Sequence, residues 1–170
     1  MVVLDELGAN VGLTPTHARA PRNEPAYDRA PGNHGANHTT LAVLTPAGLV
    51  AAMTVRGAAD ALTVEAFVRE LVVPLLRPGQ ILVLDNVATH KGDGLRRLVE
   101  GAGCQLRFLP AYSPDLSPIE EAFAQLKALL RRAKARTVAA LEAAIGTALD
   151  AITPRDARQY FAHCGYGAAK

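Results

Sequence analysis

The sequence predicts an α/β domain in which helices pack on a mixed sheet. Apolar runs at residues 2–4, 81–84 and 106–109 are short enough to be buried strands, and β-prone segments at 39–44 and 49–55 flank a tight turn. Apolar residues at helical spacing occupy the other long stretches. The order strand, hairpin, helix, strand, helix, strand, helix, helix is that of a mixed α/β sheet with helices packed on it.

Composition limits the class of protein before any motif is considered. A chain of 170 residues suits one domain, and 49% hydrophobic with 20% charged residues is a globular composition. The net charge of +2 is too small to indicate a nucleic-acid partner, so local clusters must carry that argument. Cys104 and Cys164 lie 60 positions apart without a CxxC spacing, which indicates neither a zinc site nor a disulfide framework and fits a reducing cytosol. No segment predicts a signal peptide or a membrane span.

The first strand, residues 2–4, is expected to end at Asp5. Residues 8–37 are rich in Gly, Pro, Asn, Arg and His without a regular period, which predicts a long loop. Long loops inside compact domains are usually functional or mobile. A turn at residues 45–48 then joins the two strands of a hairpin.

Four helices are expected from apolar spacing. The first ends at Pro74 and Pro78, and the second is a short helix closed by Gly101 and Gly103. A strong third helix follows the proline-rich loop at residues 110–118, and a last helix follows it. The apolar positions of the four helices are, in chain order, Val64, Phe67, Val68, Leu71 and Leu75; Leu95, Leu98 and Val99; Ile119, Phe123, Leu126 and Leu130; and Val138, Leu141, Ile145, Leu149 and Ile152.

Three acidic residues stand where secondary-structure elements begin or end. Asp5 follows the first strand, Asp85 follows a buried strand, and Glu120 begins a helix. Sites in α/β sheets form outside the carboxyl ends of strands. An ionised carboxylate after four apolar residues is costly unless something pairs with it, and oxygen ligands of this kind suit Mg²⁺ or Mn²⁺.

Each acid also has a purely structural interpretation. Asp85 can begin a turn with Asn86. Glu120 completes Ser-Pro-Ile-Glu at residues 117–120, a capping box with Pro at the first helical position, and a Glu that turns back to cap cannot also face a metal. Asp5 precedes Glu6, and strand alternation places the two on opposite faces. Local sequence leaves these alternatives open.

Three segments resemble the DDE-type transposases of the mariner-like superfamily, in particular its bacterial insertion-sequence branch. They read VVLDELG, ILVLDNVATHK and LPAYSPDLSPIEEAFAQLK, and 34 residues separate Asp85 from Glu120. The third segment is the most specific of the three. The resemblance implies a ribonuclease-H-like mixed five-stranded sheet flanked by helices, and it places the third acid at Glu120 rather than at Glu121.

The same resemblance implies a metal-dependent mechanism. Asp5, Asp85 and Glu120 would hold two Mg²⁺ or Mn²⁺ ions, with Asp5 between them, for hydrolysis at transposon ends and strand transfer into target DNA. Asn86 and His90 are candidates for contacts to the metal ligands or to DNA. His90 follows Ala88 and Thr89, a departure within a loop whose family pattern is loose.

A basic cluster follows Glu120. Residues 127–136 contain five cations and no acid, which favours sequence-independent phosphate contacts, although a helix C-terminus also attracts cations. The five candidate DNA-binding residues are Lys127, Arg131, Arg132, Lys134 and Arg136.

The resemblance treats residues 1–170 as a single catalytic domain without the helix-turn-helix domains that precede it in full-length relatives. A split reading frame, a remnant and a misplaced start are the alternatives. The expected partners are DNA, a separately encoded helix-turn-helix part and a second copy in an active homodimer, in the bacterial cytoplasm at the nucleoid. Two other functions stay open: a catalytically idle nucleic-acid-binding remnant, and a ribonuclease-H-like nuclease of another class.

Overall fold

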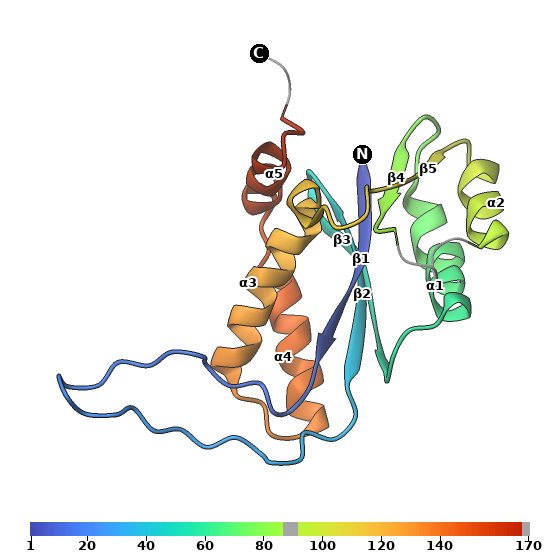
Figure 1. The fold of residues 1–170 in the computed structure, drawn as a ribbon. Helices are drawn as coiled ribbons and strands as arrows, with labels where there is room; N and C mark the ends of the chain where they lie inside the picture. The colour runs from blue at the N-terminus through green and yellow to red at the C-terminus, as the bar shows by residue number, and fades with distance from the viewer. Residues whose placement is uncertain (87–91, 168–170) are drawn as a thin grey trace.

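The computed structural model describes residues 1–86 and 92–167, which form a five-stranded mixed sheet flanked by helices (Figure 1). The strand order is β3-β2-β1-β4-β5. β1 pairs antiparallel with β2 and parallel with β4, and β4 pairs parallel with β5. The strands are β1 (Val2–Ala9), β2 (His38–Thr45), β3 (Gly48–Arg56), β4 (Ile81–Leu84) and β5 (Gln105–Phe108). The predicted mixed five-stranded sheet is confirmed.

Alternation along the strands divides the core into two halves. In β1, Val3 and Leu7 pack with α3 (Pro118–Ala133), α4 (Val138–Asp150) and α5 (Pro154–His163). The intervening Val2 and Leu4 pack with α1 (Ala61–Phe67) and α2 (Asp93–Gly101) on the opposite face. Figure 1 shows α3, α4 and α5 on one side of the sheet and α1 and α2 on the other. Odd-numbered positions of β1 therefore face α3.

The first strand is longer than its apolar run suggested. β1 continues through Asp5 to Ala9 because Leu7 and Ala9 prolong the buried alternation and pair with Thr40 and His38 of β2. The expectation that the strand ends at Asp5 is therefore wrong. Asp5 lies within the central strand of the sheet, where its backbone is fixed on both sides.

The first predicted helix is regular only in its first half. α1 ends at Phe67 and continues as a π turn, η1 (Val68–Val72), and a 3-10 turn, η2 (Val73–Leu75). Pro74 explains the change, because its ring clashes with the carbonyl four residues earlier and it has no N–H to donate. Another 3-10 turn, η4 (Pro114–Leu116), precedes α3. No helix in the described ranges is both long and apolar enough to cross a membrane.

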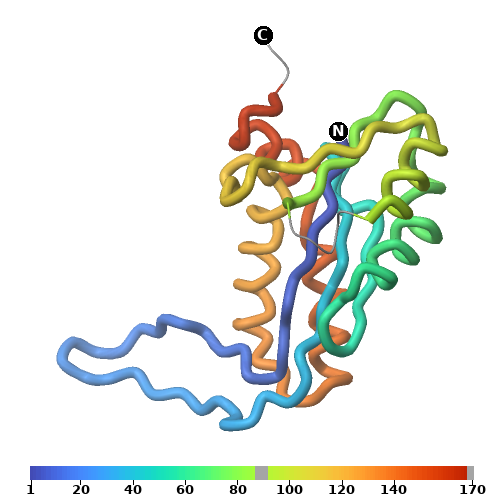
Figure 2. The backbone as a smooth tube through the Cα atoms, turned by 45° about the vertical axis from the view of Figure 1, so that its right-hand side comes forward, coloured from blue at the N-terminus to red at the C-terminus, as the bar shows by residue number. Residues whose placement is uncertain are grey.

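The predicted loop between β1 and β2 forms a long arm, residues 10–37, which extends away from the body in both views (Figures 1 and 2). Most of its residues are exposed, and Tyr27 near its middle is 89% exposed. The arm leaves and rejoins the body near the C-terminal end of α3.

The sequence interpretation did not include α5. Thr153 caps this helix: its Oγ1 accepts from the Asp156 N–H at 3.2 Å, and its own N–H donates to Asp156 Oδ2 at 3.0 Å. Pro154 occupies the first helical position, which favours a helix start. Ala157 and Phe161 bury one face of α5 in the core beside α3. The pattern Thr-Pro-Arg-Asp at 153–156 was the sequence signal that could have predicted it.

Candidate active site

Asp5, Asp85 and Glu120 line one cavity of about 360 Å³. Its remaining walls come from Asn86 and from the loop that joins β5 to α3, within residues 109–117. The three acids come from β1, from the end of β4 and from the start of α3. Residues that are far apart in sequence therefore share one opening.

Strand register places the two aspartates side by side. Val3 of β1 pairs with Val83 of β4 in parallel register, and Asp5 and Asp85 each lie two residues further along. Val3 and Val83 both belong to the core half that contains α3, so alternation directs both aspartates toward the α3 face. Glu6 has the opposite parity and faces away from this cavity. The alternation argument for Asp5 over Glu6 is consistent with this geometry.

Glu120 lies in the first turn of α3, and the capping box does not form. Ser117 is the N-cap, but its side chain makes no capping bond, and its backbone N–H donates to the Pro114 carbonyl at 2.9 Å. The Glu120 N–H donates to the Ser117 carbonyl at 3.1 Å. Glu120 therefore lines the cavity with its carboxylate outside the capping arrangement.

The cavity disfavours ionised carboxylates. Burial raises the pKa of Asp5 from 3.8 to about 7, and the negative charges of Asp85, Glu120 and Glu6 raise it further. One contact opposes this shift, since the Glu6 N–H donates to Asp5 Oδ1 at 2.8 Å. A cation among these carboxylates would relieve both their desolvation and their mutual repulsion.

The donor set fits a divalent metal ion in its chemistry. Carboxylate oxygens are the hard ligands that Mg²⁺ and Mn²⁺ take, and a cavity that opens to solvent leaves positions for water and phosphate oxygens. Across residues 1–86 and 92–167, however, no three acidic, His or Cys side chains stand close enough to hold a metal ion without moving. Loading a metal therefore requires the carboxylates to draw together by side-chain rotation.

Comparison with known proteins gives the family. The model of the DDE superfamily endonucleases matches residues 1–142. The chain belongs to this family. A comparison with curated proteins finds no match.

Solved structures of Mos1 transposase share the fold of this DDE endonuclease chain. Its paired-end complex with the left transposon end has a TM-score of 0.77 and 17% identity, over 96% of this chain and 51% of that one. The Mos1 paired-end complex with Mg has a TM-score of 0.69 and 17% identity, over 96% and 53%. The Mos1 catalytic domain alone has a TM-score of 0.59 and 16% identity, over 96% and 74%. The DDE chain thus spans about half the length of the Mos1 chains in the two complexes.

In the DDE chain, α5 and the residues after it hold the segment that carries Glu120. The Tyr166 hydroxyl donates to the Leu116 carbonyl at 2.9 Å, and the Tyr166 ring lies edge-on to Phe161 with centroids 6.3 Å apart. His163 Nδ1 lies 2.7 Å from Glu121 Oε1, which directs Glu121 toward α5. Sequence reasoning missed these contacts because it did not include α5.

Asn86 and His90 have different standings. Asn86 is exposed and lines the cavity beside Asp85, where its amide can reach a ligand. His90 lies outside the described residues.

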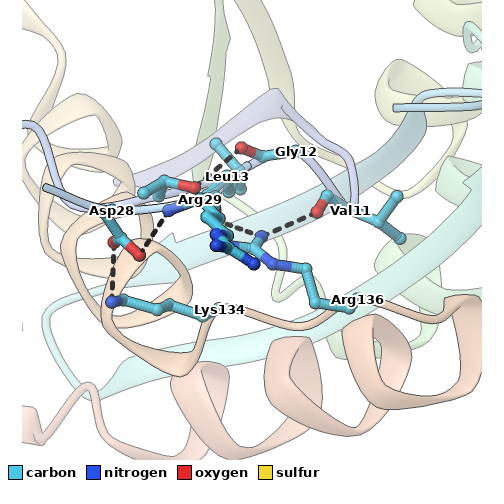
Figure 3. A network of polar contacts seen from close by, with 8 residues as sticks. Val11, Gly12, Leu13, Asp28, Arg29, Lys134 and Arg136 are labelled. Atoms are coloured by element: carbon cyan, nitrogen blue, oxygen red, sulfur yellow. Dashed lines mark hydrogen bonds and ion pairs between the residues drawn. The ribbon is translucent and has the colours of Figure 1, made fainter. Parts of the chain in front are cut away.

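The basic cluster divides into two groups. Lys134 Nζ pairs with Asp28 Oδ2 at 2.7 Å, and Arg136 holds both ends of the arm (Figure 3). The Arg136 guanidinium donates to four acceptors: the carbonyls of Val11 at 2.8 Å, Leu13 at 2.9 Å and Arg29 at 3.3 Å, and Thr14 Oγ1 at 3.0 Å. Lys127, Arg131 and Arg132 lie on α3, partly or fully exposed. Lys134 and Arg136 thus have an intramolecular role, whereas these three face solvent.

Proposed function

We propose that residues 1–170 act as the catalytic domain of a DNA transposase that cleaves DNA strands at transposon ends and joins them to target DNA. The observation that carries this proposal is the shared cavity of Asp5, Asp85 and Glu120, in a chain of the DDE superfamily endonucleases. The Mos1 structures that share the fold include complexes with transposon ends and with Mg or Mn.

Each carboxylate has a distinct role in this proposal. Asp5, on the central strand between its two partners, is the ligand shared by two Mg²⁺ or Mn²⁺ ions, while Asp85 and Glu120 each complete one coordination sphere. When bound, such ions lower the pKa of water and stabilise the charge on a departing oxygen. The chain itself positions the ligands: β1 and β4 fix the aspartates in register, and α3 brings Glu120 to them. Asn86 orients a ligand or a phosphate at the rim, and we assign His90 the same kind of role.

Phosphate contacts come from the exposed part of the basic cluster. Lys127, Arg131 and Arg132 lie along the helix that begins with Glu120, so DNA on that face leads into the cavity. Lys134 and Arg136 contribute indirectly by holding the arm, and they add positive potential nearby.

Recognition of a specific transposon end needs side chains that read base edges, usually from a helix in the major groove. We propose that a helix-turn-helix part outside residues 1–170 supplies it, and that the active form is a homodimer in the cytoplasm at the nucleoid. Membership of the bacterial insertion-sequence branch stays a prediction.

A cleavage assay tests the central proposal. End-labelled duplex DNA is incubated with the chain in Mg²⁺ or Mn²⁺, and we expect nicks that disappear with chelator and with Asp85→Asn. Asp150→Asn is the matched control, because it makes the same chemical change at an exposed position on the end of α4. Cleavage that persists in chelator or in Asp85→Asn contradicts the metal assignment.

Two other outcomes separate the remaining alternatives. DNA binding without metal-dependent cleavage of any substrate favours an idle nucleic-acid-binding remnant. Cleavage restricted to RNA–DNA hybrids or to branched junctions favours a nuclease of another class.

A further inference from the structure

Tyr112 is an aromatic residue placed in solvent at the rim of the carboxylate cavity. It lines the cavity together with Asp5, Asp85 and Glu120, yet its relative exposure is 102%. Aromatic rings supply large amounts of buried apolar area in folded proteins, and this ring contributes none. Its position therefore does nothing for the core.

The backbone at Tyr112 is also unfavourable. Its φ is +59°, in the left-handed region that Gly and Asn adopt readily and that is a rare outlier for a bulky residue. Strain of this kind persists only where the surroundings enforce it, and it concentrates at ligand-binding sites. An exposed ring on a strained backbone is a costly choice at a position where Asn would fold more easily.

The loop holds Tyr112 at a fixed place relative to the carboxylates. Before it, the Leu109 N–H donates to the Leu84 carbonyl at 2.9 Å, directly beside Asp85. After it, the Ser117 N–H donates to the Pro114 carbonyl at 2.9 Å, and Tyr166 holds Leu116. Pro110 and Pro114 restrict the backbone on either side. Both ends of the loop are thus tied to the elements that carry Asp85 and Glu120.

We propose that Tyr112 is a stacking platform for an unpaired nucleobase of the DNA strand whose phosphate occupies the carboxylate cavity. This inference rests on the proposed function. A phosphate bound among the acids through metal ions places its own sugar and base at the cavity rim, where a flat apolar ring is available. Base–aromatic stacking is sequence-tolerant, which suits a domain that contacts DNA without reading its sequence.

The test uses the full chain and two DNA probes that share one sequence, a blunt duplex and a duplex with a single-stranded 3′ overhang. 2-Aminopurine in the overhang reports stacking through quenching of its fluorescence. Ca²⁺ replaces Mg²⁺ so that the strands stay intact. We expect Tyr112→Ala to weaken overhang binding by about 5- to 150-fold and to abolish the quenching. Tyr112→Phe keeps both, because the ring and not the hydroxyl makes the contact. Tyr27→Ala is the matched control, since Tyr27 is equally solvent-exposed but lies on the arm.

A stability measurement excludes a structural role for the ring. Tyr112→Asn relieves the left-handed strain, so its Tm stays at or above that of the wild type while its quenching is lost. A Tm that falls by more than about 4 °C overturns the proposal, because it shows that the ring supports the fold. Equal effects of Tyr112→Ala and Tyr27→Ala, or no quenching by the wild type, also overturn it.

The two proposals fail in different ways. Tyr112-dependent quenching without any metal-dependent cleavage leaves the stacking site standing and removes the catalytic proposal. Cleavage that depends on Asp85 while Tyr112→Ala binds the overhang like the wild type removes the stacking site alone.

Discussion

The Tyr166 hydroxyl donates a hydrogen bond of 2.9 Å to the backbone carbonyl of Leu116, four residues before Glu120. Leu116 ends the 3-10 turn that leads into α3, so the position of Glu120 depends on this turn. Tyr166 is itself held by the edge-on Phe161 ring and by its own N–H, which donates to the Phe161 carbonyl at 2.8 Å. α5 thus braces a catalytic-loop segment that lies about 50 residues earlier in the chain.

We predict that Tyr166→Phe impairs metal binding more than folding. Loss of one hydrogen bond lowers the free energy of unfolding by about 1 kcal/mol, but it also frees the turn that positions Glu120. The expected result is a higher Mg²⁺ concentration for half-maximal cleavage, with activity restored at saturating Mg²⁺. Tyr160→Phe is the control, because the Tyr160 hydroxyl bonds Gln125 further along α3. Equal Mg²⁺ requirements in the two variants contradict the bracing role.

The raised pKa of Asp5 predicts how stability depends on pH without metal. Between pH 3.8 and about 7 the folded chain keeps a proton on Asp5 that the unfolded chain has released, so the free energy of unfolding falls as pH rises through this range. Asp5→Asn removes this slope and stabilises the metal-free chain above about pH 7. Thermal unfolding in chelator across this range measures the effect, with Asp150→Asn as the control that keeps the slope.

Added Mg²⁺ reverses this dependence, because the metal binds the ionised carboxylate. The rise in Tm that Mg²⁺ causes therefore grows as pH increases toward and beyond about 7, and it is absent in Asp5→Asn. A Mg²⁺-induced rise in Tm that is the same at every pH contradicts the assignment of Asp5 as a ligand.

Apolar pattern was sufficient to predict most of the sheet, and with it the two aspartates. The runs before Asp5 and Asp85 are the parts of β1 and β4 that pair in register, so the sequence positions of the acids carry over directly into space. Glu120 was harder, because Ser117 offered a capping box that local sequence alone favoured. The family resemblance, and not the local pattern, pointed to the carboxylate that lines the cavity.

Long-range polar contacts were beyond prediction from sequence. Arg136 bonds acceptors more than 100 residues away, and no spacing rule connects such positions. The basic cluster therefore looked uniform, although two of its members hold the arm. Tyr112 was passed over for a related reason, because neither its exposure nor its backbone conformation follows from a helical or strand period.

We predict that Arg136→Ala loosens the base of the arm. The variant loses donors to the carbonyls of Val11, Leu13 and Arg29, so amide hydrogen exchange in residues 10–14 should accelerate by about tenfold, which corresponds to roughly 1.4 kcal/mol of local stability. Arg136→Lys should behave similarly, because an ammonium cannot reproduce the planar fork of donors. Exchange in residues 20–25 stays as in the wild type, since that part is exposed already. Unchanged exchange at residues 10–14 contradicts the anchoring role.

The last prediction concerns Arg131 and Arg132 on the C-terminal part of α3. If both contact phosphate, replacing them by Gln removes up to two released counterions, and the slope of log affinity against log salt becomes flatter by up to about two units. The measurement is a salt titration of binding to duplex DNA of random sequence, where residues 1–170 should show a Kd of roughly 10⁻⁴ to 10⁻⁶ M at physiological salt. Arg155→Gln with Arg158→Gln makes the same change in net charge on the exposed face of α5 and should leave the slope nearly unchanged. Equal flattening in both double variants means that net charge alone, and not contact along α3, sets the salt dependence.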